Sequence, residues 1–319
     1  MPEISVNENI IPLIEELCVK PEVYNVKKLN IGGATVIDAG IKARGGYITG
    51  LIITEICMGG LGETNLTTIE LEEQKICGIT VYTDQPIIST LASQMAGWKI
   101  KVGEFEALGS GPARALALKP KKLYQKLNYK DTAEHAVIVL ETNKIPNEEV
   151  LTYIADKCGI ETESLYAILT PTTSLTCMVQ VSGRIIETGI HKLLNLDFDI
   201  ESIKYGWGFA PIPPPHPNFE EAMGRANDAI LYGGSVNYIV EAEDKEIEKI
   251  IEEVPSSSSP AYGKPFLEIF KEAEGDFYKI DPNLFAPAEI QITNMKTGKT
   301  FKAGKIEPKI LLRSFGFTE

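Results

Sequence analysis

The stretch "VKKLNIGGATVIDAG", residues 26–40, sets two short apolar-rich runs on either side of Gly32 and Gly33. Paired glycines between such runs predict a β-hairpin, because glycine takes the positive φ angles that a tight turn requires. A second hairpin is predicted in "AEIQITNMKTGKTFKAG", residues 288–304, around Thr297 and Gly298. Hairpins join antiparallel strands, whereas a doubly wound parallel sheet needs helical crossovers. The sequence therefore predicts an α+β (mixed α/β) fold.

Helical and strand patterns are intermixed between these two hairpins. Buried strands are predicted at "HAVIVLET" (135–142) and "LYAILT" (165–170), with an amphipathic helix between them at "NEEVLTYIADKCGI" (147–160). Ser5 and Glu8 form an S-x-x-E capping box, which predicts a first helix from about residue 6. The segment "YGWGFAPIPPPHPN" (205–218) is predicted to be neither regular helix nor central strand, because of its prolines.

Composition limits the classes of function. The chain has 319 residues, 44% apolar and 24% charged, with a net charge of −13 and a pI near 4.9. This acidic balance argues against nucleic-acid binding, which needs basic surface, but leaves room for a local anion site. Five cysteines without a CxxC pair indicate a reducing compartment. The absence of a signal-peptide pattern and of a long apolar run predicts a cytoplasmic protein without a membrane partner.

One glycine-rich loop is a candidate anion site. In "GSGPARAL" (109–116), Gly109, Ser110 and Gly111 precede Pro112 at a plausible first helical position, and Arg114 adds positive charge. A plain tight connection is the alternative. Neither this loop nor any other part of the chain has P-loop or GxGxxG spacing.

The histidines give no metal-binding pattern. His135, His191 and His216 are far apart in sequence, without an HExxH pair, so no metal site is expected. His135 begins an apolar strand and is interpreted as structural. His216 lies in "PIPPPHPN" (211–218), which is either a stiffened loop over a pocket or a surface connector. The lysines of "KPKKLYQKLNYK" (119–130) form either a solvated face or a contact for a phosphate-bearing ligand.

A polar stripe interrupts the apolar segment "SLTCMVQVSGRIIETGIHKLLNL" (174–196). Gln180, Arg184, Glu187 and His191 follow one another at steps of four, three and four, which places them on one side of a helix near 175–194. Apolar positions cover most of the remaining circumference, so the stripe is expected to face a polar cleft or a partner. A structural salt bridge between Arg184 and Glu187 is the alternative.

At these residues the chain resembles the methenyltetrahydromethanopterin cyclohydrolases, enzymes of one-carbon metabolism in methanogenic archaea and some relatives. The similarity covers essentially the whole chain, and the motifs that carry it are "SVNEN", "GATVIDAG", "CMGGLG", "LASQMAGW", "ALGSGPARAL", "GRIIETGIHKL", "YGWGFAPIPPPHP" and "GRANDAILYGG". The resemblance implies reversible hydrolysis of 5,10-methenyltetrahydromethanopterin to the 5-formyl compound in methanogenesis. It also implies no metal and no redox cofactor, since the pterin coenzyme is the substrate. Two domains facing each other across a deep cleft, and a homo-oligomer, commonly a trimer, are implied as well.

The resemblance assigns roles to part of the stripe. The Arg and Glu of the family's active-site helix match Arg184 and Glu187, the predicted catalytic residues, with Glu187 activating water and Arg184 keeping it ionised and oriented. The further candidate substrate-binding residues are Gly109, Ser110, Gly111, Arg114, Gln180, His191 and His216. The predicted domains are residues 1–88 with 286–319, and residues 89–285. A non-catalytic tetrahydromethanopterin-binding or carrier subunit is the alternative function, and another pterin hydrolase or lyase is the alternative enzyme.

Overall fold

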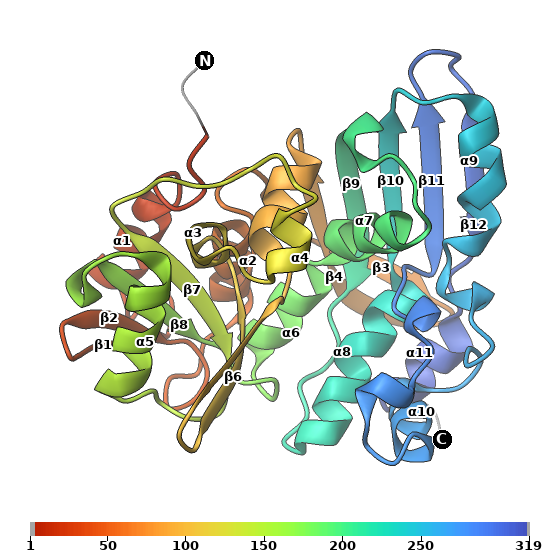
Figure 1. Ribbon diagram of the computed structural model, residues 1–319. Helices are drawn as coiled ribbons and strands as arrows, with labels where there is room; N and C mark the ends of the chain where they lie inside the picture. Colours follow the sequence, from red (N-terminus) through yellow and green to blue (C-terminus); the bar gives the residue numbers. More distant parts are fainter. Residues whose placement is uncertain (1–3, 318–319) are drawn as a thin grey trace. The chain divides into compact units, whose positions relative to one another are not determined.

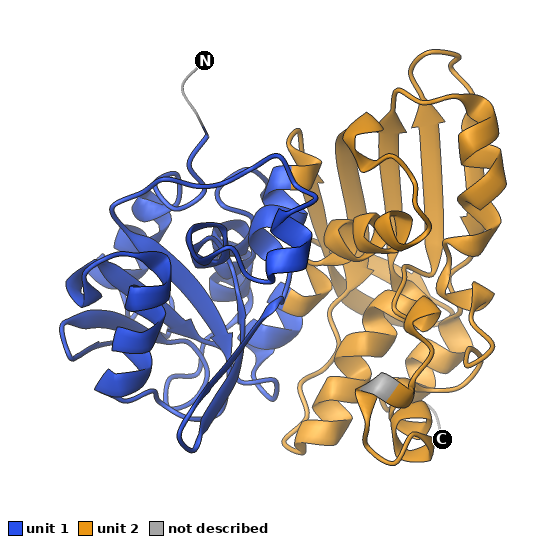
Figure 2. Ribbon diagram, viewed as in Figure 1, with its two compact units in different colours: residues 1–63, 88–180 blue, residues 64–87, 181–319 orange. Residues whose placement is uncertain are grey.

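The computed structural model describes residues 4–317, so residues 1–3 and 318–319 of the predicted first domain lie outside it. The chain forms two compact units, Met1–Glu63 with Ile88–Gln180 and Thr64–Ile87 with Val181–Glu319 (Figure 2). Each unit contains one six-stranded mixed sheet with helices, which confirms the α+β class and the two-domain organisation. The unit boundaries differ from the predicted domain boundaries. Residues 64–87 and 286–319 both join the second unit, because their strands pair with strands of that unit.

The sheet of the first unit has the strand order β1-β2-β8-β7-β6-β5 (Figure 1). Its strands are β1 (Lys27–Ile31), β2 (Ala34–Asp38), β5 (Trp98–Val102), β6 (Phe105–Ser110), β7 (Ala136–Glu141) and β8 (Leu165–Leu169). The β2, β7 and β8 strands run parallel, whereas β1 and the β5–β6 pair are antiparallel to their neighbours. The hairpin predicted at Gly32 and Gly33 is confirmed: Ile31 pairs with Ala34, and both glycines have positive φ, 57° and 93°.

Helices cover both faces of this sheet. Alternate side chains of β7 point to opposite sides, as a strand requires. Val137 and Val139 pack with α1 (Ile11–Val19) and α2 (Tyr47–Cys57), whereas Ile138 and Leu140 pack with α5 (Glu148–Cys158). The remaining helical segments of the unit are η1 (Ile88–Gln94), α3 (Ala113–Ala117), α4 (Lys121–Tyr124), η2 (Thr162–Ser164) and the first part of α6 (Leu175–Ser182).

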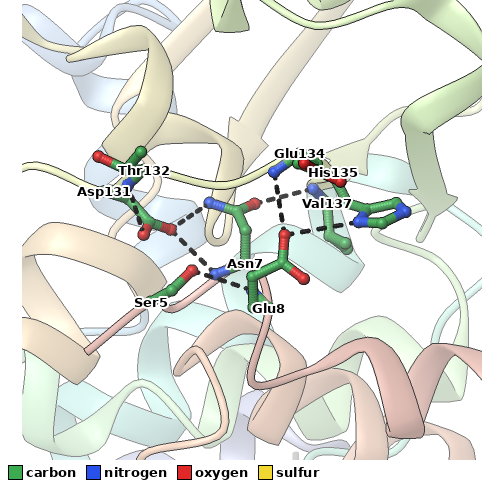
Figure 3. A network of polar contacts seen from close by, with 8 residues as sticks. All are labelled: Ser5, Asn7, Glu8, Asp131, Thr132, Glu134, His135 and Val137. Atoms are coloured by element: carbon green, nitrogen blue, oxygen red, sulfur yellow. Dashed lines mark hydrogen bonds and ion pairs between the residues drawn. The ribbon is translucent and has the colours of Figure 1, made fainter. Parts of the chain in front are cut away.

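A buried asparagine ties the N-terminal segment to this unit (Figure 3). Asn7 has no exposed surface. Its Nδ2 donates to Asp131 Oδ2 at 2.7 Å and to the Pro112 carbonyl at 3.0 Å, and its Oδ1 accepts the Val137 N–H at 3.0 Å. The side chain thereby satisfies three polar groups that each lie more than 100 residues away from it in the sequence.

The predicted start of the first helix is wrong by a few residues. Ser5 Oγ accepts the Glu8 N–H at 3.1 Å, as one half of a capping box would, but α1 begins only at Ile11. The Glu8 carboxylate accepts the Glu134 N–H at 3.0 Å and lies 3.5 Å from His135 Nδ1 (Figure 3). A tertiary contact therefore replaces the reciprocal bond that would complete the box. The same contact agrees with the structural interpretation of His135.

The sheet of the second unit has the strand order β12-β11-β10-β9-β4-β3 (Figure 1). Its strands are β3 (Glu63–Leu71), β4 (Gln74–Thr83), β9 (Ile203–Pro211), β10 (Ser235–Val240), β11 (Glu289–Asn294) and β12 (Thr300–Gly304). The β10 and β11 strands are parallel, and β9 is antiparallel to both β10 and β4. The C-terminal hairpin is confirmed, with Thr293 paired to Thr300 and Gly298 at φ 72°.

The prediction that residues 205–218 contain no central strand is wrong for their first half. Strand β9 lies between β10 and β4. Its only proline, Pro211, is the last residue of the strand. A Cβ at Gly206 would lie 3.1 Å from Ile186, and one at Gly208 would lie 2.9 Å from Ile185. These glycines are needed because a helix packs closely on the strand at both positions.

That helix is α7 (Ile185–Asn195), which packs on β9 and β10, while α8 (Phe219–Gly233) packs on β9 (Figure 1). Helices α10 (Phe266–Glu272) and α11 (Pro308–Ser314) pack against α8 and complete an apolar cluster around Tyr232 and Phe266. The other helical segments are η3 (Ile200–Ser202), α9 (Asp244–Ile250), η4 (Ile251–Glu253), η5 (Ser256–Ser258), η6 (Phe277–Lys279) and η7 (Pro282–Leu284). Within residues 4–317, none of the helices has the length and apolar character that crossing a bilayer would need.

Candidate active site

The segment that carries the polar stripe is two helices, not the single helix predicted near 175–194. Helix α6 ends at Ser182 and α7 begins at Ile185, with Gly183 and Arg184 forming a turn between them. The Arg184 N–H bonds to the Val181 carbonyl at 3.0 Å, a step of three residues that tightens the chain. The break matters because Arg184 becomes the N-cap residue of α7, and Glu187 falls in its first turn.

Three of the four stripe residues line one pocket of the second unit. The cavity has a volume of about 190 Å³. Its polar lining consists of Arg184, Glu187, Thr188, His191 and Asn227. Its apolar walls are Val181, Ala226, Ile230, Leu231 and Phe285. Helix α7 thus supplies most of the polar groups, and α8 supplies the facing wall together with Phe285.

Glu187 is a buried carboxylate in the first turn of a helix. Its side chain is 8% exposed and that of Arg184 is 9% exposed. Glu187 lies in the first turn of α7, where unpaired backbone N–H groups and the helix dipole favour negative charge. A buried carboxylate with a guanidinium in the same cavity is suited to accept a proton from a bound water molecule.

Thr188 and Asn227 belong to the pocket but are not predicted from the sequence. Thr188 Oγ1 donates to the Arg184 carbonyl at 3.0 Å, and Asn227 Nδ2 donates to the Met223 carbonyl at 2.9 Å. Both bonds join residues four apart on a helix and fix the rotamers. In the sequence, only the position of Thr188 directly after Glu187 could have indicated that it lines the pocket. Asn227 lies in the predicted helical segment "GRANDAILYGG", and nothing in that segment predicts a pocket.

A buried lysine anchors the far end of α7 next to the pocket. Lys192 is 2% exposed, and its Nζ donates to Asn283 Oδ1 at 2.8 Å and to the Asn283 carbonyl at 3.3 Å. Burial lowers the pKa of Lys192, although the negative charges of Asp281 and Glu253 oppose this shift. Two residues beyond Asn283, Phe285 lines the pocket, so this contact holds one of the pocket walls against α7.

Gln180 of the stripe and His216 of the proline-rich segment do not line this pocket. Gln180 is on α6 in the first unit, buried, with Nε2 3.5 Å from Cys177 Sγ. His216 Nδ1 accepts the Asn218 N–H at 3.1 Å in the loop that leads into α8. In the same loop, Arg225 Nη1 donates to the Pro214 carbonyl at 3.2 Å. These bonds agree with the interpretation of the proline-rich loop as a connector.

The glycine-rich loop makes contacts within its own unit and leads into a short helix. Gly109 and Ser110 are the last residues of β6, and the Gly111 N–H is bonded to the Ser93 carbonyl at 3.0 Å. The helix that follows, α3, has only five residues, which is too short for a substantial dipole. Ser110 Oγ lies 3.8 Å from Cys57 Sγ and 3.4 Å from the Val139 carbonyl. These contacts are those of a tight connection, and a ligand-binding role for the loop stays a prediction.

Arg114 has a structural environment. Its side chain has no exposed surface, Nη1 donates to the Ser93 carbonyl at 3.1 Å, and both Nη atoms donate to the Leu91 carbonyl at 3.3 Å. The guanidinium also lies 5.7 Å from the ring centroid of Tyr124. Burial raises the pKa of Tyr124 to about 12, so its hydroxyl stays neutral beside the cation. Arg114 holds η1 and α4 together, and its role in binding a ligand tail stays a prediction.

We expect Arg114→Met to lower the free energy of unfolding by about 2–3 kcal/mol, because buried carbonyls of Leu91 and Ser93 lose their donors. Chemical denaturation measures this change. Lys121→Met, which removes an exposed cation from the same region, is the control and should leave stability nearly unchanged. Equal stability of the two variants would contradict a structural role for Arg114.

Candidate metal ligands do not gather in the described part of the chain. Among residues 4–317, no three His, Cys, Asp or Glu side chains are grouped so that they could hold a metal ion.

Comparison with known proteins gives one consistent match. A family model described as Cyclohydrolase (MCH) matches residues 5–315. The chain is 44% identical over 315 residues to the methenyltetrahydromethanopterin cyclohydrolase of Methanococcoides burtonii, covering 98% of both chains. It is 43% identical to the protein of that name from Methanocaldococcus jannaschii, covering 99% of both. The protein of that name from Methanospirillum hungatei is 45% identical, covering 98% of this chain and 99% of the relative.

Proposed function

The chain belongs to the MCH cyclohydrolase family, and from this premise we propose that it hydrolyses the methenyl bridge of tetrahydromethanopterin with Glu187 as the base that activates water. The observation that supports the assignment of the base is the burial of Glu187 in a pocket that Arg184 and His191 also line. The pocket volume of about 190 Å³ is smaller than that of a site for a whole coenzyme. It suits the reacting end of the substrate.

The substrate's own charge makes the reaction feasible with these groups. The methenyl bridge is an N=CH–N⁺ unit, so its carbon is already electrophilic. Glu187 takes one proton from water as the oxygen bonds to this carbon, which gives a neutral carbinolamine. The C–N10 bond then breaks, N10 takes the proton from Glu187, and the carbinolamine hydroxyl releases its proton as the formyl C=O forms. One water molecule is consumed and one proton is released overall.

Each polar group of the pocket has a role in this sequence. The carboxylate of Glu187 stabilises the cationic substrate before it acts as base. Arg184 balances the charge of Glu187 before the cationic substrate binds and again after Glu187 has given the proton to N10. His191 and Asn227 are placed to hydrogen-bond the water or the carbinolamine oxygen, since both line the same cavity. The apolar walls exclude bulk water and strengthen these interactions.

The direct test is to mix the protein with the methenyl compound and follow the ultraviolet band of the conjugated bridge. Hydrolysis removes the conjugation, so the band disappears with turnover. A binding or carrier subunit would perturb the band in proportion to protein concentration and would not consume it. A band that persists with substrate in excess would therefore contradict the enzymatic proposal.

Metal independence is the second part of the proposal. Because the bridge carbon needs no Lewis acid to become electrophilic, we expect exhaustive treatment with a chelator to leave kcat unchanged. The measurement is the same absorbance assay before and after chelation and dialysis. Loss of activity that added Zn²⁺ restores would show that a metal takes part.

The oligomeric state stays a prediction. The family resemblance implies a homo-oligomer, commonly a trimer, and sedimentation equilibrium at several concentrations measures the mass of the assembly directly against the 35.0 kDa chain.

A further inference from the structure

A tyrosine hydroxyl from the sheet bonds to the backbone of the helix that carries Glu187. Tyr238 lies on β10 and is 1% exposed. Its hydroxyl donates to the Ile186 carbonyl at 2.7 Å. The sheet therefore holds the backbone of α7 one residue before Glu187.

Gly189 makes the space for this hydroxyl. A Cβ at position 189 would lie 2.2 Å from Tyr238 Oη and 3.1 Å from Val236 Cγ1. Such a contact is far below the sum of van der Waals radii, so no other residue fits without displacing the phenol. Glycine in the interior of a helix costs stability, and a close approach of a neighbouring group is a physical reason for its presence here.

The phenol of Tyr238 stays protonated at neutral pH. Burial raises the pKa of Tyr238 well above its ordinary value, and the nearby negative charge of Glu187 adds to the shift. The hydroxyl therefore keeps its proton and remains a donor to Ile186.

We infer that Tyr238 is a positioning residue that sets the direction of Glu187 within the pocket. The turn from Ile186 to Ile190 carries two pocket residues, Glu187 and Thr188, and His191 follows it directly. The bond from the Tyr238 hydroxyl to the Ile186 carbonyl fixes this turn against β10. If the hydroxyl is removed, the turn loses this anchor and its side chains reorient. This inference rests on the proposed role of Glu187 as the base.

The first experiment compares two buried tyrosines. We expect Tyr238→Phe to lower kcat between about 10- and 100-fold, the cost typical of misplacing a reacting group by about 1 Å. KM should change less than about twofold, because the walls of the pocket are intact. The control is Tyr232→Phe. Tyr232 is also buried, its hydroxyl donates to the Lys264 carbonyl at 2.6 Å, and it accepts the Gly263 N–H at 3.2 Å.

The control separates positioning from stability. Both variants lose a buried hydroxyl that donates to a backbone carbonyl, so both should lower the melting temperature. Only Tyr238→Phe should lower the kcat of the folded protein. If the two variants lose stability and keep the same kcat, Tyr238 is structural and the inference is wrong.

A double-mutant cycle tests the same contact, and its result does not depend only on whether the Tyr238→Phe variant folds. Gly189→Ala forces a methyl group against the phenol and should also lower kcat by about 10-fold or more. In Gly189→Ala/Tyr238→Phe the hydroxyl that clashes is gone, so the loss should be much smaller than the product of the two single losses. Independent, multiplicative losses would overturn the inference.

Glu187→Gln in the same assay distinguishes this inference from the proposed function. If Glu187→Gln turns over normally, the assignment of the base fails, and the positioning inference fails with it. If Glu187→Gln loses activity while Tyr238→Phe and Gly189→Ala do not, the base assignment stands and only the role of Tyr238 is wrong.

Discussion

Glu187→Gln is expected to lower kcat by at least about 100-fold while the protein stays folded. Glutamine keeps the size and much of the hydrogen bonding of Glu187 but cannot take a proton from water. Positioned acid–base groups contribute roughly 10²- to 10⁴-fold to a rate, which sets the expected range. The burial of Glu187 in a cavity leaves little bulk water to replace it as base. The measurement is kcat from the loss of the methenyl absorbance under saturating substrate.

The matched control is Glu289→Gln in the same unit. Glu289 accepts a bond from Ser235 Oγ at 2.9 Å and pairs with Lys302 at 2.8 Å, outside the pocket lining. Its substitution should cost some stability and leave kcat unchanged. A folded Glu187→Gln protein with near-normal turnover would mean that Glu187 is structural and that another group activates water.

Arg184→Met separates catalysis from the alternative of a structural salt bridge. If the stripe is catalytic, removal of the guanidinium lowers kcat of the folded protein, because Glu187 loses the cation that balances its charge in the cavity. If the pair is only structural, both Arg184→Met and Glu187→Gln lower the melting temperature, and the remaining folded protein turns over normally. Measuring kcat and the thermal midpoint on the same samples decides between these outcomes.

Asp228→Asn is expected to stabilise the protein by about 4 kcal/mol above neutral pH and to have little effect near pH 4. Asp228, on α8, has no exposed surface, and burial raises its pKa from the ordinary 3.8 to about 7. It accepts bonds from the Phe266 N–H at 2.8 Å and from Ser314 Oγ at 2.6 Å, which oppose the shift only in part. Asparagine can accept the first bond and donate in the second, so both contacts survive.

The sign follows from proton linkage. The folded protein holds the Asp228 proton more tightly than the unfolded chain, so the stabilisation is complete below about pH 4 and is lost as pH rises through about 7. A shift of about three pH units corresponds to about 4 kcal/mol. Because other carboxylates titrate in the same range, the quantity to measure is the difference in unfolding free energy between the variant and the wild type, at pH 4 and at pH 8.

Asp281→Asn is a control for which the expected change in stability at pH 8 has the opposite sign. Partial burial would raise the pKa of Asp281, but hydrogen bonds from Ser259 and Asn283 outweigh it and the pKa is lowered. This carboxylate stabilises the fold at neutral pH and loses that contribution in acid, so Asp281→Asn should destabilise at pH 8. If Asp228→Asn is not more stable than wild type at pH 8, the buried carboxylate is not protonated preferentially in the folded state.

Local turn chemistry made much of the fold predictable. The Gly32–Gly33 and Thr297–Gly298 hairpins were predicted because positive φ is a local requirement that residue type reports directly. Strand β9 was missed because the reason for Gly206 and Gly208 is the approach of α7, which is a tertiary fact. The break after Ser182 was missed because both halves of the segment have helical periodicity, and only Gly183 hinted at a boundary.

The candidate site shows the same division between local and tertiary information. The spacing of three and four residues predicted that Arg184, Glu187 and His191 lie on one side of a helix, and all three line the pocket. Asn227 and Phe285 come from segments with no sequence signal linking them to that stripe, so only folding identifies them. Arg114 was predicted to contact a ligand because a charged residue beside a glycine loop suggests an anion site. Its burial against backbone carbonyls has no signal in the sequence.

The path of the chain has a consequence for synthesis on the ribosome. Strand β4 ends at Thr83, but β9, the neighbour that completes its pairing, begins only at Ile203. About 120 further residues must therefore be synthesised before β9 can pair with β4. This synthesis takes on the order of 10 seconds at usual translation rates. During that interval the edge of the β3–β4 pair is open, and open strand edges are sites of aggregation. The speed of translation between residues 84 and 203 sets how long the nascent chain stays in this vulnerable state.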